Sequence, residues 1–174
     1  HHLAFDAGTN RVLLFGGYDA SGSLSDTWAW DGSAWQRLAS ATSPEGRMEF
    51  AFSFDPIRNR GVLLGGYLND ARYADTWEFG PSGWSKLIAT VPFSGTTRPE
   101  VVFDTARNVL LLHGGRGAKR VSGWGESYET WQLNLQDGDS DGTPNCADGC
   151  PSDALKTAPG QCGCGVADTD TDSD

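Results

Sequence analysis

The sequence repeats itself every 49 residues, and this repeat limits the possible folds more than any other feature. A Phe-Asp pair, an asparagine and a double glycine recur at that spacing. They are Phe5-Asp6, Phe54-Asp55 and Phe103-Asp104; Asn10, Asn59 and Asn108; and Gly16-Gly17, Gly65-Gly66 and Gly114-Gly115. A fixed period of this length is the signature of repeat architectures. Three consecutive units therefore occupy most of the 174 residues.

Each unit predicts four short strands. The first ends in Phe-Asp, and the second is a continuous apolar run such as residues 12–15, typical of a strand buried on both faces. The third, such as residues 27–30, alternates as a half-buried strand does. A turn at Asp31-Gly32 leads to the fourth strand, residues 35–38. The double glycine permits a positive φ where the buried strand leaves the sheet.

Two further patterns recur in these units. Asp26-Thr27-Trp28 returns as Asp75-Thr76-Trp77, and Trp35 returns as Trp84. Four strands in a unit of ~50 residues, with a double glycine and spaced tryptophans, resemble the Kelch repeat of β-propellers. The resemblance covers residues 1–136, with repeats at about 1–49, 50–98 and 99–136. It implies an all-β fold, a partial Kelch-type β-propeller of three four-stranded blades.

Many sequences of this pattern are related to the central domain of galactose oxidase, and that relation concerns the fold. The enzyme itself needs a copper site with a Cys–Tyr crosslink, and residues 1–136 contain no cysteine. We therefore expect a non-enzymatic module. The alternative is a galactose-oxidase-like or other propeller enzyme whose active site lies in further blades. A structural spacer of a surface array is the third possibility.

The third unit ends differently from the first two. Gly138 takes the place of the second tryptophan, so we expect the last blade to lack its fourth strand. A propeller ring needs ~4–8 blades, so we expect further blades upstream of residue 1. Self-association of two half-propellers is the alternative.

Residues 137–174 differ in composition from the rest of the chain. They hold nine aspartates, one lysine and all four cysteines, a local charge of −8 out of the total of −10. Such an acidic segment attracts cations and repels nucleic acid, so we expect no nucleic-acid partner. We interpret this segment as a second, irregular domain held together by calcium and disulfides.

The aspartates in this segment have a spacing suited to calcium. Carboxylates at positions 1, 3 and 5 of a loop with glycine at position 6 can converge on one hard cation. The first predicted ligand set is Asp137, Asp139, Asp141, Thr143, Asn145 and Asp148, and a second run is Asp168, Asp170 and Asp172. Calcium is the predicted cofactor. The competing interpretation is an acidic, solubilising linker.

The four cysteines, Cys146, Cys150, Cys162 and Cys164, predict disulfides and an oxidising compartment. The segment resembles the thrombospondin type 3 repeat, which implies calcium binding outside the cell. Cys162 and Cys164 lie too close to pair with each other comfortably, so we expect each to bond to Cys146 or Cys150. The sequence leaves the connectivity open. A zinc site is the alternative, although the Cys-x-Cys spacing fits it poorly.

A possible ligand loop lies in residues 117–127, where the third unit has five additional residues. Lys119, Arg120 and Trp124 fall in this irregular stretch. Propeller loops commonly meet ligands, although a solvent-facing loop without a role is the alternative. The recurring Trp28, Trp35, Trp77 and Trp84 are instead expected to pack within and between blades.

Together these patterns predict a binding or adhesion module of a secreted or cell-surface protein. The propeller would bind a protein or carbohydrate partner. No run of residues approaches the ~18 apolar positions of a membrane helix, so no membrane span is expected in this sequence.

Overall fold

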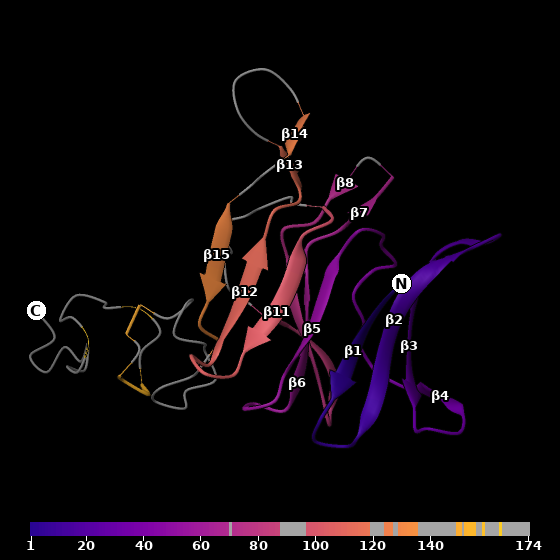
Figure 1. The fold of residues 1–174 in the computed structure, drawn as a ribbon, viewed down its shortest axis with the longest axis horizontal. Coiled ribbons are helices and arrows are strands. Elements are labelled where there is room, and N and C mark those ends of the chain that lie inside the picture. The colour runs from indigo at the N-terminus through magenta and orange to yellow at the C-terminus, as the bar shows by residue number, and fades with distance from the viewer. Residues whose placement is uncertain are drawn as a thin grey trace, which may run out of the picture. The chain divides into compact units, whose positions relative to one another are not determined.

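The computed structural model describes residues 1–69, 71–87, 97–118, 124–126, 129–135, 149–150, 152–155, 158 and 164. Within these ranges every regular element is a β-strand, and every strand pair is antiparallel (Figure 1). The chain divides into two compact units, His1–Leu133 and Asn134–Asp174. The fold is therefore all-β, as the sequence predicts, and the sheets belong to the first unit.

The sheets follow the sequence repeat. The first has the order β1 (His2–Asp6), β2 (Arg11–Asp19), β3 (Gly22–Trp30), β4 (Trp35–Leu38). The second has the same order, with β5 (Ala51–Asp55), β6 (Arg60–Leu64), β9 (Thr76–Gly80) and β10 (Gly83–Leu87). The third contains β11 (Glu100–Asp104), β12 (Val109–His113) and β15 (Thr130–Leu133). Each unit thus forms a sheet from strands that are close in sequence.

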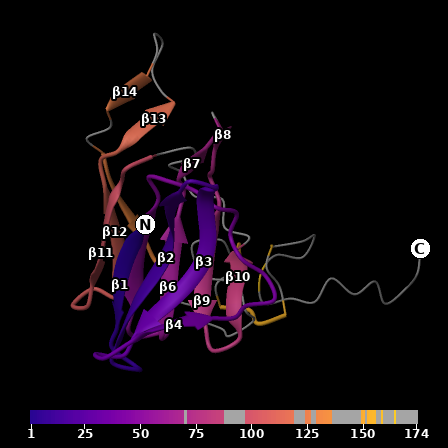
Figure 2. The ribbon, with the colours of Figure 1, turned by 90° about the vertical axis from the view of Figure 1, so that its right-hand side faces the viewer.

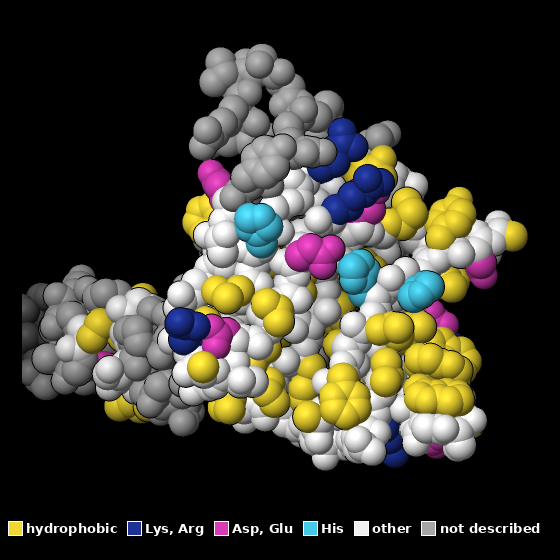
Figure 3. Space-filling view, in the orientation of Figure 1, with side chains coloured by type: hydrophobic (Ala, Val, Ile, Leu, Met, Phe, Trp, Pro, Cys, Tyr) yellow, Lys and Arg dark blue, Asp and Glu magenta, His cyan; other side chains and the backbone are white. Residues whose placement is uncertain are grey.

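The three sheets stand side by side through their first strands. β1 contacts β5, and β5 contacts β11. Figure 1 shows β11, β5 and β1 in this order, and Figure 2 shows the first sheet from its side. The exposed side chains of the first strands are apolar at Leu3, Phe5 and Val102, which are 51%, 55% and 58% exposed. In Figure 3 hydrophobic side chains gather over this face.

A hydrophobic core fills the space between the first and second sheets. Its centre is Trp84, 3% exposed, whose ring meets Phe15 at 5.1 Å and Phe79 at 5.2 Å between centroids. These separations are typical of packed aromatic pairs. The apolar run of the second unit is buried on both faces as predicted, since Val62, Leu63 and Leu64 are at most 1% exposed. In the first unit Leu13 and Phe15 are buried but Val12 and Leu14 are only partly buried, so the prediction is wrong for one face of that run. Burial of these runs is what holds neighbouring units together.

The Phe-Asp pair and the asparagine form the first turn of each unit. Asp6 Oδ1 accepts hydrogen bonds from the backbone N–H groups of Gly8 at 2.9 Å and Thr9 at 3.1 Å. The aspartates at the same place in the other units bind two backbone N–H groups in the same way. The asparagines have φ between 55° and 56°, a left-handed conformation that asparagine tolerates better than most residues. The Phe-Asp pair and the asparagine therefore recur because the aspartate and the asparagine stabilise the same turn in each unit.

A short two-stranded ribbon follows the double glycine of each later unit. These ribbons are β7 (Tyr67–Leu68) with β8 (Ala71–Arg72), and β13 (Arg116–Ala118) with β14 (Trp124–Glu126). In the first unit the same region is a continuation of β2 and β3, with a register shift between Phe15 and Gly17. The prediction of an irregular stretch at residues 117–127 was therefore wrong at residues 117–118 and 124–126, which lie in paired strands.

Candidate functional site

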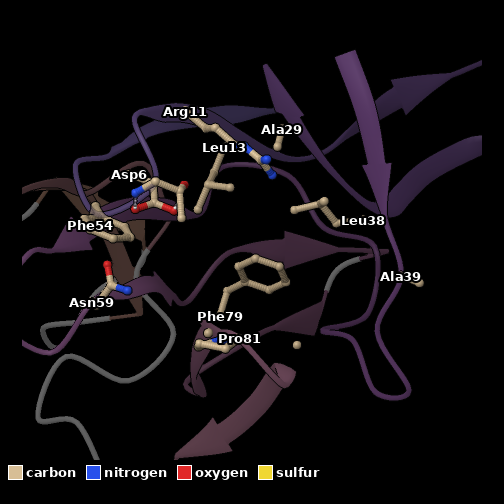
Figure 4. A pocket seen from close by; sticks show the side chains of 13 residues that line it. Asp6, Arg11, Leu13, Ala29, Leu38, Ala39, Phe54, Asn59, Phe79 and Pro81 are labelled. Atoms are coloured by element: carbon tan, nitrogen blue, oxygen red, sulfur yellow. Dashed lines mark hydrogen bonds between the residues drawn. The ribbon is translucent and has the colours of Figure 1, made fainter. Parts of the chain in front are cut away.

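A cavity of about 310 Å³ with apolar walls and a polar rim lies between the first and second sheets (Figure 4). It lies at the end of the sheets where the β1–β2, β5–β6 and β9–β10 turns come together. The ribbons β7–β8 and β13–β14 emerge at the opposite end, because they follow the far ends of β6 and β12. Turns from two units therefore enclose the candidate site.

The walls of the cavity are apolar. Leu13 and Ala29 come from the central strands of the first sheet, and Phe79 comes from the facing strand β9. In Figure 4 the Phe79 ring and Leu38 point into the same space. The aliphatic side chains and the aromatic ring give the site a surface suited to the apolar face of a ligand.

The rim carries one acidic and one basic side chain. Asp6 is occupied by its own turn, since Oδ2 also accepts a hydrogen bond from Thr9 Oγ1 at 2.6 Å. Arg11 points toward the cavity in Figure 4, and no carboxylate in the described part of the chain lies within ion-pair distance of its guanidinium. Arg11 therefore offers hydrogen-bond donors to a ligand that bears an acceptor or a negative charge.

This arrangement is suited to binding. Asp6 is the one carboxylate among the lining residues, and its oxygens bind backbone and hydroxyl donors of the turn. General acid–base catalysis needs a titratable group that is free to exchange a proton with a ligand. The other lining residues supply apolar walls, the guanidinium of Arg11 and the amide of Asn59.

The other recurring aspartates have structural partners. Asp26 Oδ2 accepts the indole N–H of Trp28 at 2.6 Å, and Asp75 Oδ2 accepts that of Trp77 at 2.8 Å. Asp75 also binds Arg47, which is 1% exposed, through Nη1–Oδ1 at 2.5 Å. Both aspartates fix tryptophans and lie at or just before the third strand.

The predicted metal ligands lie outside the described residues. These are Asp137, Asp139, Asp141, Thr143, Asn145, Asp148, Asp168, Asp170 and Asp172. Lys119 and Arg120 also lie outside them, while the backbone of Trp124 begins β14 and pairs with Ala118. The proposed ligand loop therefore has a described frame, β13 and β14, and its basic residues are not among the described positions.

One disulfide is present in the described part of the C-terminal unit. It joins Cys150 to Cys164, one of the pairings that the sequence left open. Cys146 and Cys162 lie outside the described residues. The bond closes a loop between positions 14 residues apart.

His113 lies in β12 but is exposed, and its Nδ1 lies 2.9 Å from Thr130 Oγ1. One expected packing position is corrected by the structure. Trp35 is 43% exposed although its counterpart Trp84 is buried. The reason is that Trp84 enters the space between the first and second sheets, while Trp35 lies on the edge strand of the first sheet and meets the ring of Trp30 at 5.6 Å.

Sequence reasoning missed the cavity and the buried arginine. Arg11 and Phe79 belong to different units and give no signal that they share a site. Arg47 has no arginine at the corresponding place in the third unit, which is Thr96, so it did not stand out as a repeat residue. The glycine before Arg47 recurs as Gly95 and was the available signal. In the structure a Cβ at Gly46 would lie 2.5 Å from the carbonyl oxygen of Ser23.

Comparisons with known proteins identify the fold alone. No protein-family model matches the sequence, and no curated protein sequence matches it. A solved structure of the protein YjhT is similar to this chain at 17% sequence identity, with a TM-score of 0.57 over 78% of the chain. The chain spans 43% of the length of that structure. Within the described ranges no helix has the length and apolar character needed to cross a membrane.

Proposed function

We propose that this chain is part of a Kelch-type β-propeller that serves as a non-enzymatic binding or adhesion module of a secreted or cell-surface protein. The cavity between the first and second sheets carries the proposal. It combines apolar walls that include Phe79 with the guanidinium of Arg11, which has no carboxylate of the described residues within ion-pair distance. A protein side chain or a carbohydrate that bears an acceptor next to an apolar face matches these features.

The propeller part of the proposal is supported by the arrangement of the sheets. The first two units form antiparallel sheets of the same four-strand order, the third forms a sheet of the first three strands among the described residues, and the first strands of all three lie side by side. The exposed Leu3, Phe5 and Val102 lie on these first strands. In a propeller such strands face the central axis, so neighbouring blades would cover apolar side chains that are exposed in this chain.

The secreted location is supported by the Cys150–Cys164 bond. Disulfides form and persist in oxidising environments such as the cell exterior, and they are rare in the cytosol.

The test is a binding screen on a glycan array and a peptide array, with the oxidised full chain as the probe. Ala39→Trp would fill the cavity from an exposed position, and Arg11→Ala would remove the guanidinium. Arg107→Ala is the matched control, because it removes the same charge from an exposed turn of the third sheet. We expect both cavity variants to weaken the same ligands by at least about tenfold, equivalent to roughly 1.4 kcal/mol, and the control to bind as the parent does. Ligands that bind all variants equally would contradict the cavity as the binding site.

Calcium binding by residues 137–174 is a second proposal, and the spacing of the aspartates supports it. Calorimetric titration of the oxidised chain with calcium should show saturable binding that Asp139→Ala and Asp141→Ala each weaken. Asp153→Ala is the control, since Asp153 lies outside both aspartate runs. Equal heats for all variants would reduce the segment to an acidic linker.

A further inference from the structure

Two residues that line the cavity are small, and their counterparts in the second unit are long and charged. Thr9 and Ala29 line the cavity from the first unit. The residues 49 positions later are Arg58 and Glu78. Because the first two sheets have the same strand order, the two pairs of residues occupy equivalent places. The second unit therefore fills with its own side chains the place that the first unit leaves open.

Arg58 and Glu78 fill this place with an ion pair. The Arg58 guanidinium donates a hydrogen bond to Glu78 Oε1, and the side chain of Glu78 is 7% exposed. Asp55 Oδ2 lies 3.9 Å from the same guanidinium. Burial of a carboxylate is unfavourable unless a donor compensates for the lost water. The fold thus accommodates a buried glutamate side chain at this place when a guanidinium is beside it.

In the first unit position 29 has no carboxylate, but a guanidinium lies close to it. Leu13 is directly opposite Ala29 in the register of β2 and β3, and Arg11 is two residues before Leu13 on the same face of β2. A long side chain at such a diagonal position can reach across to the neighbouring strand. In Figure 4 the Arg11 side chain extends toward Ala29. A carboxylate held over Ala29 would therefore be within reach of the Arg11 guanidinium.

The two carboxylates nearest to Arg11 have other partners. Both oxygens of Asp6 accept hydrogen bonds from its own turn. Asp31 is exposed, and hydrogen bonds from Ala34 and Ser33, with a smaller contribution from the charge of Arg11, lower the pKa of its carboxyl to about 2. Neither carboxylate lies within ion-pair distance of the guanidinium. Arg11 therefore keeps donors that can bind a carboxylate from outside the chain.

The size and the walls of the cavity suit one acidic side chain. Its volume of about 310 Å³ is at the lower end of the ~300–1,000 Å³ that ligand pockets have. Leu13, Ala29 and Phe79 present apolar surface to the methylene groups of such a side chain. An oligosaccharide would instead bring hydroxyl groups against these walls, where they would lose water without gaining a hydrogen bond.

We propose that the cavity binds the side chain of a glutamate on a partner protein. The methylene groups of this glutamate lie against Leu13 and Phe79, and its carboxylate binds the guanidinium of Arg11. The glutamate takes the place over Ala29 that Glu78 occupies in the second unit. This proposal rests on the proposed function, because it names the chemical group that the same cavity recognises.

The probe is the peptide Gly-Glu-Gly with an acetylated N-terminus and an amidated C-terminus, so that the side chain is its one carboxylate. Its binding to the oxidised full chain is followed in a nitrogen–proton NMR spectrum through the amide signals of Gly80 and Gly83, which line the cavity. The amide signal of Gly114 in the third unit is the reference. We expect the Gly80 and Gly83 signals to shift, and the matching Gly-Gln-Gly peptide to bind at least about tenfold more weakly.

Two variants of the protein test the role of the guanidinium. Arg11→Ala should remove the preference for glutamate over glutamine in the peptide. Arg107→Ala is the matched control, because it removes the same charge from an exposed turn of the third sheet. It should retain the preference of the parent.

A tethered carboxylate keeps the proposal testable if the free peptide binds weakly. Ala29→Glu places the carboxylate in the cavity, and Ala29→Gln is its neutral match. The Ala29→Glu chain should unfold at a higher urea concentration than the Ala29→Gln chain, and Arg11→Ala should abolish this difference. Ala29→Glu should also prevent binding of the glutamate peptide.

Equal affinity for the two peptides, or equal urea midpoints for the two Ala29 variants, would overturn the proposal. Array ligands that Ala39→Trp weakens but that carry no carboxylate would overturn it as well, and they would leave the proposed function intact. A uronic acid that shifts the Gly80 and Gly83 signals when the glutamate peptide does not would overturn the stated partner. Failure of the proposed function itself is a separate result, in which no array ligand is weakened by Ala39→Trp.

Discussion

The indole nitrogen of Trp84 donates a buried hydrogen bond to the hydroxyl oxygen of Thr27 at 2.8 Å. The two residues are 57 positions apart, and each belongs to a different sheet. Around this bond the Trp84 ring packs on Phe15 of the first sheet and Phe79 of the second. One side chain from the edge strand of the second sheet therefore completes the core that it shares with the first.

Removing the indole N–H should destabilise the junction between the two sheets. Trp84→Phe keeps an aromatic ring but loses the donor and part of the ring volume, so we expect a loss of about 2–4 kcal/mol in the free energy of unfolding. Urea denaturation followed by circular dichroism measures it. Trp35→Phe is the matched control, because Trp35 is at the same repeat position and exposed. It should change stability by no more than about 0.5 kcal/mol. Equal losses at the two positions would contradict the assigned role.

The Arg47–Asp75 ion pair should make a large contribution, because it is buried and bidentate. Arg47→Met removes the guanidinium, keeps much of the volume and leaves a buried carboxylate unpaired. A loss of roughly 3–5 kcal/mol is expected by urea denaturation. Arg107→Met, which removes an exposed partner of Asp104, is the comparison and should cost at most about 1 kcal/mol. A small loss at Arg47 would show that the carboxylate finds other donors.

Asp75 also predicts a pH dependence. The pKa of its carboxyl is lower in the folded protein than in the unfolded chain, so the folded state binds the proton less readily. Its contribution to stability is therefore complete above the unfolded value of ~3.9 and is lost as the pH falls through the folded pKa. The difference in unfolding free energy between the parent and Asp75→Asn should shrink as the pH falls from about 5 through the folded pKa. A difference that is constant over this range would contradict the prediction.

The left-handed asparagines should tolerate glycine better than alanine. Asn108 has a φ of 56°, a backbone conformation in which a Cβ atom is sterically unfavourable. Asparagine pays a smaller energetic cost there than most residues, because its side chain can form local hydrogen bonds. Asn108→Ala should cost about 1 kcal/mol in the free energy of unfolding, and Asn108→Gly should be within about 0.5 kcal/mol of the parent. Urea denaturation of the three proteins gives the order. Equal costs for alanine and glycine would place the effect in the lost side chain and not in the backbone.

The C-terminal disulfide can be checked by mass spectrometry. A digest of the non-reduced chain should contain a fragment in which Cys150 is joined to Cys164, and reduction should release its two parts. Replacing both cysteines by serine should make bonds in residues 149–164 more sensitive to proteases, because the open segment loses a constraint. A fragment that joins Cys150 to Cys162 instead would contradict the structure.

The strands could be predicted because each unit is local and repeated. The apolar run of residues 12–15 and the alternation of residues 27–30 lie in β2 and β3 as expected. Both strands are longer than predicted, since backbone pairing resumes after the irregularity between Phe15 and Gly17 and continues to Asp19 and Gly22. The spacing of apolar residues predicts the part of a strand that is buried in the sheet. It gives little information about where a strand ends once it extends beyond the buried part.

The candidate site could not be predicted in the same way. Arg11 and Phe79 face one cavity only because the first and second sheets pack together, and this packing is not visible in either unit alone. The Arg47–Asp75 pair was hidden for another reason. The aspartate recurs but its partner does not, so a search for repeats finds one half of the interaction.

The contact of Trp84 with Thr27 joins two different surfaces, the edge strand of one sheet and the third strand of its neighbour. Such a head-to-tail contact has a direction, and it can be made again by an added unit that carries both residues. Because Thr27 and Thr76, and likewise Trp35 and Trp84, are 49 residues apart, an insertion or deletion of one whole period between the first two units would join equivalent surfaces. A deletion of a few residues in the linker at residues 39–49 would instead shift Gly46 and Arg47 away from their partners. We therefore expect the fold to tolerate insertions or deletions of a whole repeat unit, and to be destabilised by insertions or deletions of part of a unit.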